Sequence, residues 1–190
     1  LEVMEENSIT IDGTTYPAYE PFIVIATQNP FGSAGTQPLP ESQLERFLMC
    51  LSCGYPDAKA EIQILKSKNK DHAELKQVAD TAKIITMQKH CDEIFIHDDL
   101  YAYIVSLVQQ TRTHPSISQG ASPRASIALA SSARAHAYLC NRTYIIPDDI
   151  HATYYDIMQH RIYLSEGSNT RAEKMAILKE ILEQTSEPAI

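Results

Sequence analysis

The sequence lacks several features that would assign it to a functional class directly. No glycine is followed by lysine, so there is no GxxxxGK[ST] loop to cradle nucleotide phosphates. No apolar strand ends in paired acids suited to Mg²⁺, and no apolar run approaches the ~20 residues of a membrane span. Basic residues are also scarce: 24 acidic against 16 basic side chains leave a net charge of −8, which argues against nucleic-acid or anionic membrane surfaces.

Cysteines are few as well. Cys50, Cys53, Cys91 and Cys140 are too sparse for a disulfide framework, and the start Leu1–Glu6 is acidic where a signal peptide would be basic. We therefore expect a reduced, cytoplasmic protein. Cys50 and Cys53 form a CxxC pair without a matching second pair, inside an apolar run, so we expect core cysteines and no metal site. A thiol or metal regulator is the weaker alternative.

The composition predicts two units. Six of the ten prolines and four of the six glycines lie in the first 56 residues, and helical patterns dominate afterwards. We place the boundary between residues 56 and 57. Residues 1–56 are predicted to be mixed α/β, and residues 57–190 to be all-helical.

The first unit reads as the end of a parallel sheet with a hairpin. An Asp-Gly pair at 12 and 13 separates the β-rich runs Ser8–Ile11 and Thr14–Tyr16. The unbroken apolar runs Phe22–Ala26 and Phe47–Cys53 are typical of buried parallel strands, with a short helix Glu41–Arg46 between them. Two such strands cannot form a stable sheet alone, so we expect missing neighbours upstream and an exposed apolar surface here.

The second unit shows helical periodicity and helix start signals. Leu100, Ile104, Leu107 and Val108 follow the i, i+4, i+7, i+8 spacing of an amphipathic helix. Ser122 is placed to cap a helix that has Pro123 at its first position. The tail after residue 184 is predicted to be frayed. The helices are predicted over Ala58–Lys68, Lys76–Cys91, Asp98–Arg112, Pro123–Leu139, Pro147–His160 and Arg171–Gln184.

Asn29 is the first candidate catalytic residue. It follows the apolar strand Phe22–Ala26, at the edge where open α/β sheets bind ligands. A neutral amide there could orient an attacking water beside a phosphate. The alternative is a turn-forming asparagine before Pro30.

Arg46 is the second candidate. It lies at the end of a short predicted helix, and its guanidinium could stabilise charge on a transferring phosphate from across an interface. The alternative is an ordinary helix-end arginine that pairs with Glu41 or Glu45.

Arg124 is the third candidate. It lies in the first turn of a predicted helix, where free backbone N–H groups and the helix dipole favour an anion. A cation placed there opposes the dipole, which is easier to explain if an anion binds. The alternative is a solvated arginine or one paired with an acidic neighbour.

Together, and in this order, the motifs resemble the MoxR family of AAA+ ATPases over about Leu1 to Leu164. Each motif is weak alone, but their ordered cluster is specific. Those resembling the family's α/β core are Leu1–Glu6, Thr10–Thr14, Pro21–Pro30, Gly35-Thr36, Pro38–Glu41, Gln43-Leu44, Arg46-Phe47 and Gly54–Pro56. Those resembling its helical lid are Thr111-Arg112, Gly120–Ala125 and Tyr144–Ile150.

The resemblance implies a fold and roles for the three candidates. The chain would be the remnant of a P-loop parallel sheet with a β-hairpin insert, followed by an all-α lid. Asn29 would be sensor 1, Arg46 the arginine finger that reaches the neighbouring subunit, and Arg124 the sensor 2 residue that closes on ATP. The parent would bind ATP and Mg²⁺, assemble into a ring (expected to be a hexamer), and remodel client proteins.

The Walker A loop and Walker B acids of that family should then lie upstream of Leu1. We therefore expect the chain alone to bind ATP poorly and not to hydrolyse it. The alternative is a helical adaptor without enzymatic activity, in which the arginines are surface charges. An upstream GxxxxGK[ST] followed by an apolar strand ending in Asp-Glu would favour the ATPase.

Overall fold

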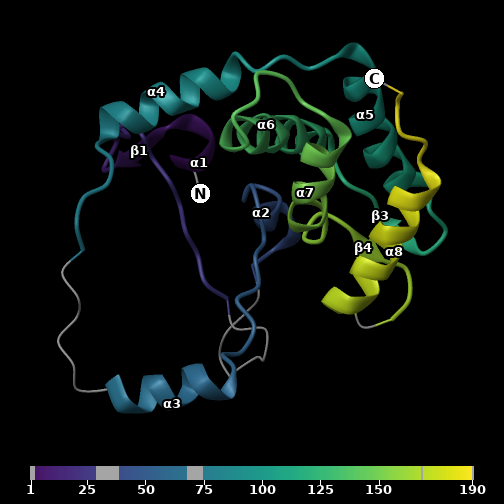
Figure 1. The fold of residues 1–190 in the computed structure, drawn as a ribbon, viewed down its shortest axis with the longest axis horizontal. Coiled ribbons are helices and arrows are strands. Elements are labelled where there is room, and N and C mark those ends of the chain that lie inside the picture. Colours follow the sequence, from purple (N-terminus) through teal and green to yellow (C-terminus); the bar gives the residue numbers. More distant parts are fainter. Residues whose placement is uncertain (1–2, 29–38, 68–74, 168, 190) are drawn as a thin grey trace.

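The computed structural model describes residues 3–28, 39–67, 75–167 and 169–189 (Figure 1). The helices are α1 (Val3–Glu6), α2 (Glu41–Leu44), α3 (Ala58–Ser67), α4 (Thr81–Asp92), α5 (Asp98–Thr113), α6 (Pro123–Leu139), α7 (Pro147–Met158) and α8 (Arg171–Gln184). The strands are β1 (Ser8–Ile11), β2 (Thr14–Pro17), β3 (Ile117–Gln119) and β4 (Tyr163–Leu164). Among the described residues, no helix has both the length and the apolar character needed to cross a membrane.

The predicted hairpin is confirmed. Strands β1 and β2 pair antiparallel with Ser8 opposite Pro17 and Ile11 opposite Thr14. Asp12 and Gly13 have φ values of 50° and 79°, so both central residues of the turn are left-handed. That backbone matches the right-handed twist of a hairpin and explains why an Asp-Gly pair occupies the turn.

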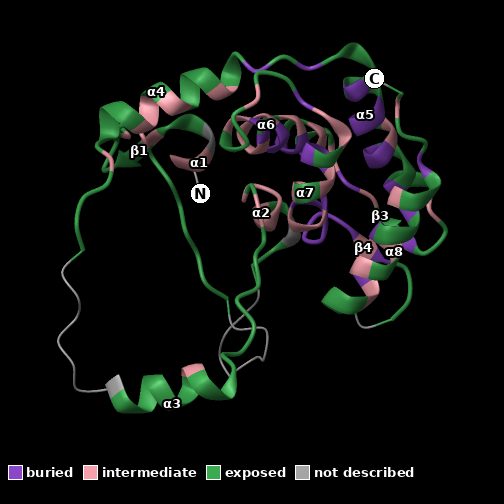
Figure 2. Ribbon diagram, viewed as in Figure 1, coloured by how far each residue is buried: buried purple, intermediate pink, exposed green. Residues whose placement is uncertain are grey.

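The two predicted parallel strands are not formed, which corrects the expected local structure. Phe22–Ala26 and Phe47–Cys53 have no strand partner among the described residues, and both run as irregular chain. Their apolar side chains are largely exposed, with Ile25 at 87% and Leu51 at 69% (green in Figure 2). The expected exposed apolar surface is therefore found, because a strand without a neighbour cannot pair its backbone or cover its side chains.

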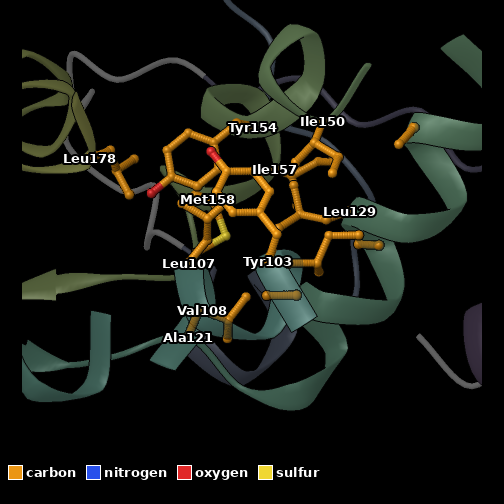
Figure 3. Close-up of a cluster of buried hydrophobic side chains, with 14 of the residues drawn as sticks. Tyr103, Leu107, Val108, Ala121, Leu129, Ile150, Tyr154, Ile157, Met158 and Leu178 are labelled. Atoms are coloured by element: carbon orange, nitrogen blue, oxygen red, sulfur yellow. The ribbon is translucent and has the colours of Figure 1, made fainter. Parts of the chain in front are cut away.

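The core lies among α5, α6, α7 and α8. Helices α6 and α7 pack extensively against each other, and Ala125, Ala133 and Ala137 of α6 are fully buried. Larger side chains fill the remaining space, and Figure 3 shows Leu129, Tyr154 and other members of this cluster turned toward one another. The four apolar positions predicted on the face of α5 are buried, as their spacing indicated: Leu100, Ile104, Leu107 and Val108.

Two features of the lid departed from prediction. Strands β3 and β4 form a small antiparallel sheet with Ile117 opposite Leu164, and they are too short for periodicity to reveal. The expected fraying of the tail is wrong at its start, because the buried Thr185 donates its hydroxyl to Ile181 O at 2.7 Å. Further on, Glu187 lies 3.7 Å from His151, so the tail follows the lid surface.

Helix boundaries shifted where a cap decided them. Helix α4 begins five residues later than predicted, because Asp80 accepts a hydrogen bond from the backbone of Lys83 at 2.7 Å and caps it. Helix α3 stands apart from the other helices in Figure 1, and its Ile62 and Leu65 are exposed. The part of the second unit in which helices pack against one another therefore begins at α4.

Candidate functional site

The loop before α6 is held by two residues of α5. Thr111 accepts a hydrogen bond from the backbone N–H of Ala121 at 3.0 Å, and Arg112 Nε donates to Ala121 O at 2.9 Å. Gly120 passes so close that a Cβ there would lie 2.6 Å from the Cα of Arg112. The Thr-Arg pair and the glycine therefore fix where α6 begins, and with it the position of Arg124.

Arg124 lies in the first turn of α6, as predicted, and is exposed. Ser122 occupies the N-cap position and Pro123 the first turn, but the Ser122 side chain makes no capping hydrogen bond. The predicted N-cap position of Ser122 is therefore confirmed, but its hydroxyl does not satisfy the first backbone N–H groups of the helix. The first turn of α6 thus combines the positive end of a helix dipole with an exposed arginine.

Arg46 lies two residues after the end of α2, and its chain segment is bound to Arg161, just beyond the end of α7. The Arg161 guanidinium donates to the carbonyls of Glu45 at 3.3 Å, Phe47 at 2.8 Å and Leu48 at 3.1 Å. The half-buried Arg46 therefore sits on a stretch of backbone anchored on both of its sides.

The positive charge of Arg124 also acts on Arg161. Burial lowers the pKa of Arg161 to about 10, the charge of Glu45 opposes that shift, and the positive charge of Arg124 adds to it. The pKa of Arg161 is therefore affected by Glu45, in the segment that carries Arg46, and by Arg124 in the first turn of α6. Hydrogen bonds therefore place the segment that carries Arg46 beside this buried guanidinium, and the positive charge of Arg124 acts on the pKa of the same group.

The remaining predicted residues fare differently. Asn29 lies outside the described residues, so its role stays a prediction. The expectation that Cys50 and Cys53 are core cysteines is wrong: both are exposed free thiols, because the segment around them lacks a covering sheet. Within the described ranges, no group of three or more His, Cys, Asp or Glu side chains could hold a metal ion.

Sequence reasoning missed the run Gln159, His160 and Arg161, which looked like an ordinary helix end. All three are buried, with exposures of 6%, 7% and 2%. A signal was available: the run lies between the apolar Met158 and Ile162, both fully buried. Three polar residues enclosed by core positions indicate that their hydrogen bonds are made inside the protein.

His160 should make stability pH-dependent. Burial, aided by the positive charges of Arg161 and Lys174, lowers the pKa of His160 from 6.5 to about 4, against hydrogen bonds to the Phe47 and Asp156 carbonyls. A lowered folded-state pKa stabilises the protein fully above pH 6.5, and this contribution is lost as the pH falls towards 4. We expect the unfolding free energy to drop by about 3 kcal/mol over that window from this residue alone.

Urea denaturation at a series of pH values measures this effect. His160→Asn should flatten the curve between pH 6.5 and 4, whereas replacing the exposed His90 by asparagine should leave it unchanged. An equally steep curve in His160→Asn would contradict the assignment.

Comparisons with known proteins define the class. Residues 1–49 match the family model "ATPase family associated with various cellular activities (AAA)", and residues 109–181 match the model "AAA lid domain". The crystal structure of a putative ATPase from Cytophaga hutchinsonii superposes with a TM-score of 0.87 at 33% identity, covering 99% of this chain and 61% of that one. The chain is an AAA+ segment, in which the end of an α/β core precedes a helical lid.

Curated relatives narrow the class. The uncharacterized protein YeaC of Bacillus subtilis is 42% identical over 99% of this chain, which spans 60% of the relative. Chaperone MoxR1 of Mycobacterium tuberculosis is 36% identical over 87% of this chain, which spans 46% of that protein. Protein MoxR of Methylorubrum extorquens is 28% identical over 86% of this chain and 54% of its own length. The chain belongs to the MoxR family, as the sequence motifs indicated.

Proposed function

We propose that this chain is the C-terminal part of a MoxR-type ATPase, the parent protein, that couples Mg-ATP hydrolysis to remodelling of client proteins. The chain spans about half to three fifths of the relatives it matches, which leaves room for a Walker A loop and Walker B acids before it. Residues 1–56 would close the α/β core, and residues 57–190 would form the lid. The cytoplasm is the expected compartment, since all four cysteines are free thiols.

The single observation that carries this proposal is the convergence of two distant segments at Arg161. The backbone beside Arg46 is hydrogen-bonded to Arg161, and Arg124 lies near enough to lower the pKa of Arg161. Two segments that each carry an arginine, one from the core and one at a helix start, would suit an anionic ligand held between core and lid. ATP carries the charge that this surface favours.

Each candidate then has a role. Arg124 would contact the phosphates of ATP bound by its own subunit when the lid closes. Arg46 would reach the ATP of the neighbouring subunit in a ring, for which a hexamer is proposed. Asn29 would orient the attacking water. Mg²⁺ would be held by the Walker B acids of the parent's core.

Replacing Arg124 tests the proposal. In the parent protein, Arg124→Ala should weaken ATP binding at least tenfold and lower turnover, because a phosphate loses a charge-assisted donor. Fluorescent-nucleotide titration and steady-state ATPase assays measure both effects. Arg171→Ala is the matched control, since Arg171 is also an exposed arginine in the first turn of a lid helix, α8.

The outcomes separate the proposal from its alternative. If the chain is a helical adaptor, no nucleotide binding will be detected in the wild-type protein, in Arg124→Ala or in Arg171→Ala. The chain of residues 1–190 alone should show no turnover; clear hydrolysis by the pure chain, abolished by Arg124→Ala, would contradict the view that the phosphate-gripping residues lie elsewhere.

A further inference from the structure

Three consecutive side chains at the end of α7 hold the segment around Arg46. Gln159 Nε2 donates to Cys50 O at 2.5 Å, and His160 Nε2 contacts Phe47 O at 3.0 Å. The Arg161 guanidinium makes the remaining side-chain contacts. A backbone hydrogen bond from Cys50 N to Asp156 O at 2.9 Å adds to them. We call Gln159, His160 and Arg161 the clasp.

Arg161 is the centre of the clasp, and its hydrogen bonds enclose Arg46. Its Nη2 donates to the carbonyls of Glu45 and Phe47, the residues immediately before and after Arg46. Its Nη1 donates to Leu48 O at 3.1 Å and back to Ile157 O of α7 at 2.8 Å. One guanidinium therefore attaches the backbone before and after Arg46 to the lid.

Arg161 is a buried cation, so its hydrogen bonds must offset the cost of removing it from water. It is only 2% exposed, and taking a guanidinium out of water carries a large desolvation cost. The guanidinium of Arg161 donates to backbone carbonyls, three of them in one short segment. A planar fork of donors can bind several carbonyls at once, whereas a lysine ammonium on a flexible stem cannot hold the same geometry.

We propose that Arg161 is a positioning residue for Arg46: it fixes the backbone on both sides of Arg46 to the lid, so that movement of the lid is passed on to Arg46. This inference rests on the proposed function, in which Arg46 acts on ATP in the neighbouring subunit. Helix α7, which leads into Arg161, packs along α6, which carries Arg124. Through the clasp, binding or loss of ATP in one subunit would change the position of Arg46 at the ATP site of the neighbouring subunit.

The test compares ATP hydrolysis by the parent protein in wild type, Arg46→Ala, Arg161→Lys and the double variant. Arg161→Lys keeps the charge but loses the fork. We expect it to lower kcat about 10- to 100-fold, the scale of a small displacement of a catalytic group, while KM and fluorescent-nucleotide affinity stay within twofold. The double variant should be no slower than Arg46→Ala alone, because Arg161 acts through Arg46.

Arg134→Lys is the matched control. Arg134 lies in α6 and also donates to a backbone carbonyl, Ile94 O at 3.2 Å, but it has no contact with the segment around Arg46 in the described structure. Its replacement should leave kcat unchanged. Should Arg161→Lys fail to fold, Gln159→Met weakens the clasp at Cys50 instead, and the same kcat loss without a change in nucleotide affinity is expected.

Two failures can be told apart. If Arg46→Ala leaves kcat unchanged, the proposed function of Arg46 is wrong. If Arg46→Ala slows hydrolysis but Arg161→Lys does not, or if the two losses multiply in the double variant, the positioning role of Arg161 is overturned. Loss of nucleotide affinity in Arg161→Lys would likewise indicate a general weakening of the lid.

Discussion

In the parent protein, Arg46→Ala is expected to lower the turnover of ATP by about 10³- to 10⁵-fold, the range over which arginine fingers contribute to phosphoryl transfer. ATP binding should stay close to wild type, because the finger would act on charge that develops in the transition state rather than on bound ATP. Steady-state hydrolysis and nucleotide titration on the same preparations give the two quantities.

Mixing experiments show whether Arg46 acts across an interface. Wild-type and Arg46→Ala subunits co-assembled at increasing ratios should lose more activity than the wild-type fraction predicts, since each variant subunit disables a neighbour's site. A strictly proportional decline would place Arg46 in its own subunit's site. Arg171→Ala subunits, mixed at the same ratios, serve as the control and should not change activity per ring.

Asp149→Ala should destabilise the lid by about 3–5 kcal/mol, the cost of leaving a buried ionic partner uncompensated. Asp149 is fully buried and accepts hydrogen bonds from Arg142 Nη1 at 2.7 Å, His136 Nδ1 at 2.7 Å and the backbone of Ile146 at 2.8 Å. Removing the carboxylate leaves the Arg142 guanidinium and the first turn of α7 without their acceptor. Urea denaturation monitored by circular dichroism measures the loss.

The neighbouring Asp148 offers the matched control, because it is exposed in the same helical turn. Asp148→Ala should change the unfolding free energy by no more than about 0.5 kcal/mol. An equal effect of the two substitutions would show that the buried network contributes nothing beyond the helix dipole.

The acid side of the stability curve gives an independent check on Asp149. Burial alone would raise the pKa of this carboxyl, but the hydrogen bonds from Arg142, Ile146 and His136 outweigh burial and lower the pKa. A lowered folded-state pKa means that this stabilisation is present above about pH 4 and is lost as the pH falls further. Asp149→Asn should lack that component of acid denaturation.

Much of the helical lid could be predicted from the sequence, because its signals are local. The apolar spacing in α5 and the Pro123 and Pro147 starts each fix structure within a few residues, as the Asp-Gly turn does in the hairpin of the first unit. The start of α6 was predictable for the same reason, and so was Arg124 in its first turn. Thr111 and Gly120 were visible as motifs, but only the structure shows that they hold the loop before Arg124.

Features that depend on distant partners could not be read in this way. Phe22–Ala26 and Phe47–Cys53 have the composition of buried strands, yet composition cannot say whether a neighbouring strand is present to pair with them. Asp148 and Asp149 look alike as first-turn acids, and only the approach of Arg142 and His136 separates a surface residue from a core one. Arg161 was missed because its partners lie more than a hundred residues earlier in the chain.

The choice of backbone carbonyls as acceptors for Arg161 determines which substitutions can break the attachment. Because Arg161 binds main-chain oxygens, which every amino acid supplies, changes of side chain at residues 47 and 48 leave its acceptors in place. Replacing the guanidinium would remove all of these hydrogen bonds at once, whereas replacing a side chain of the gripped segment would leave its carbonyl acceptors in place.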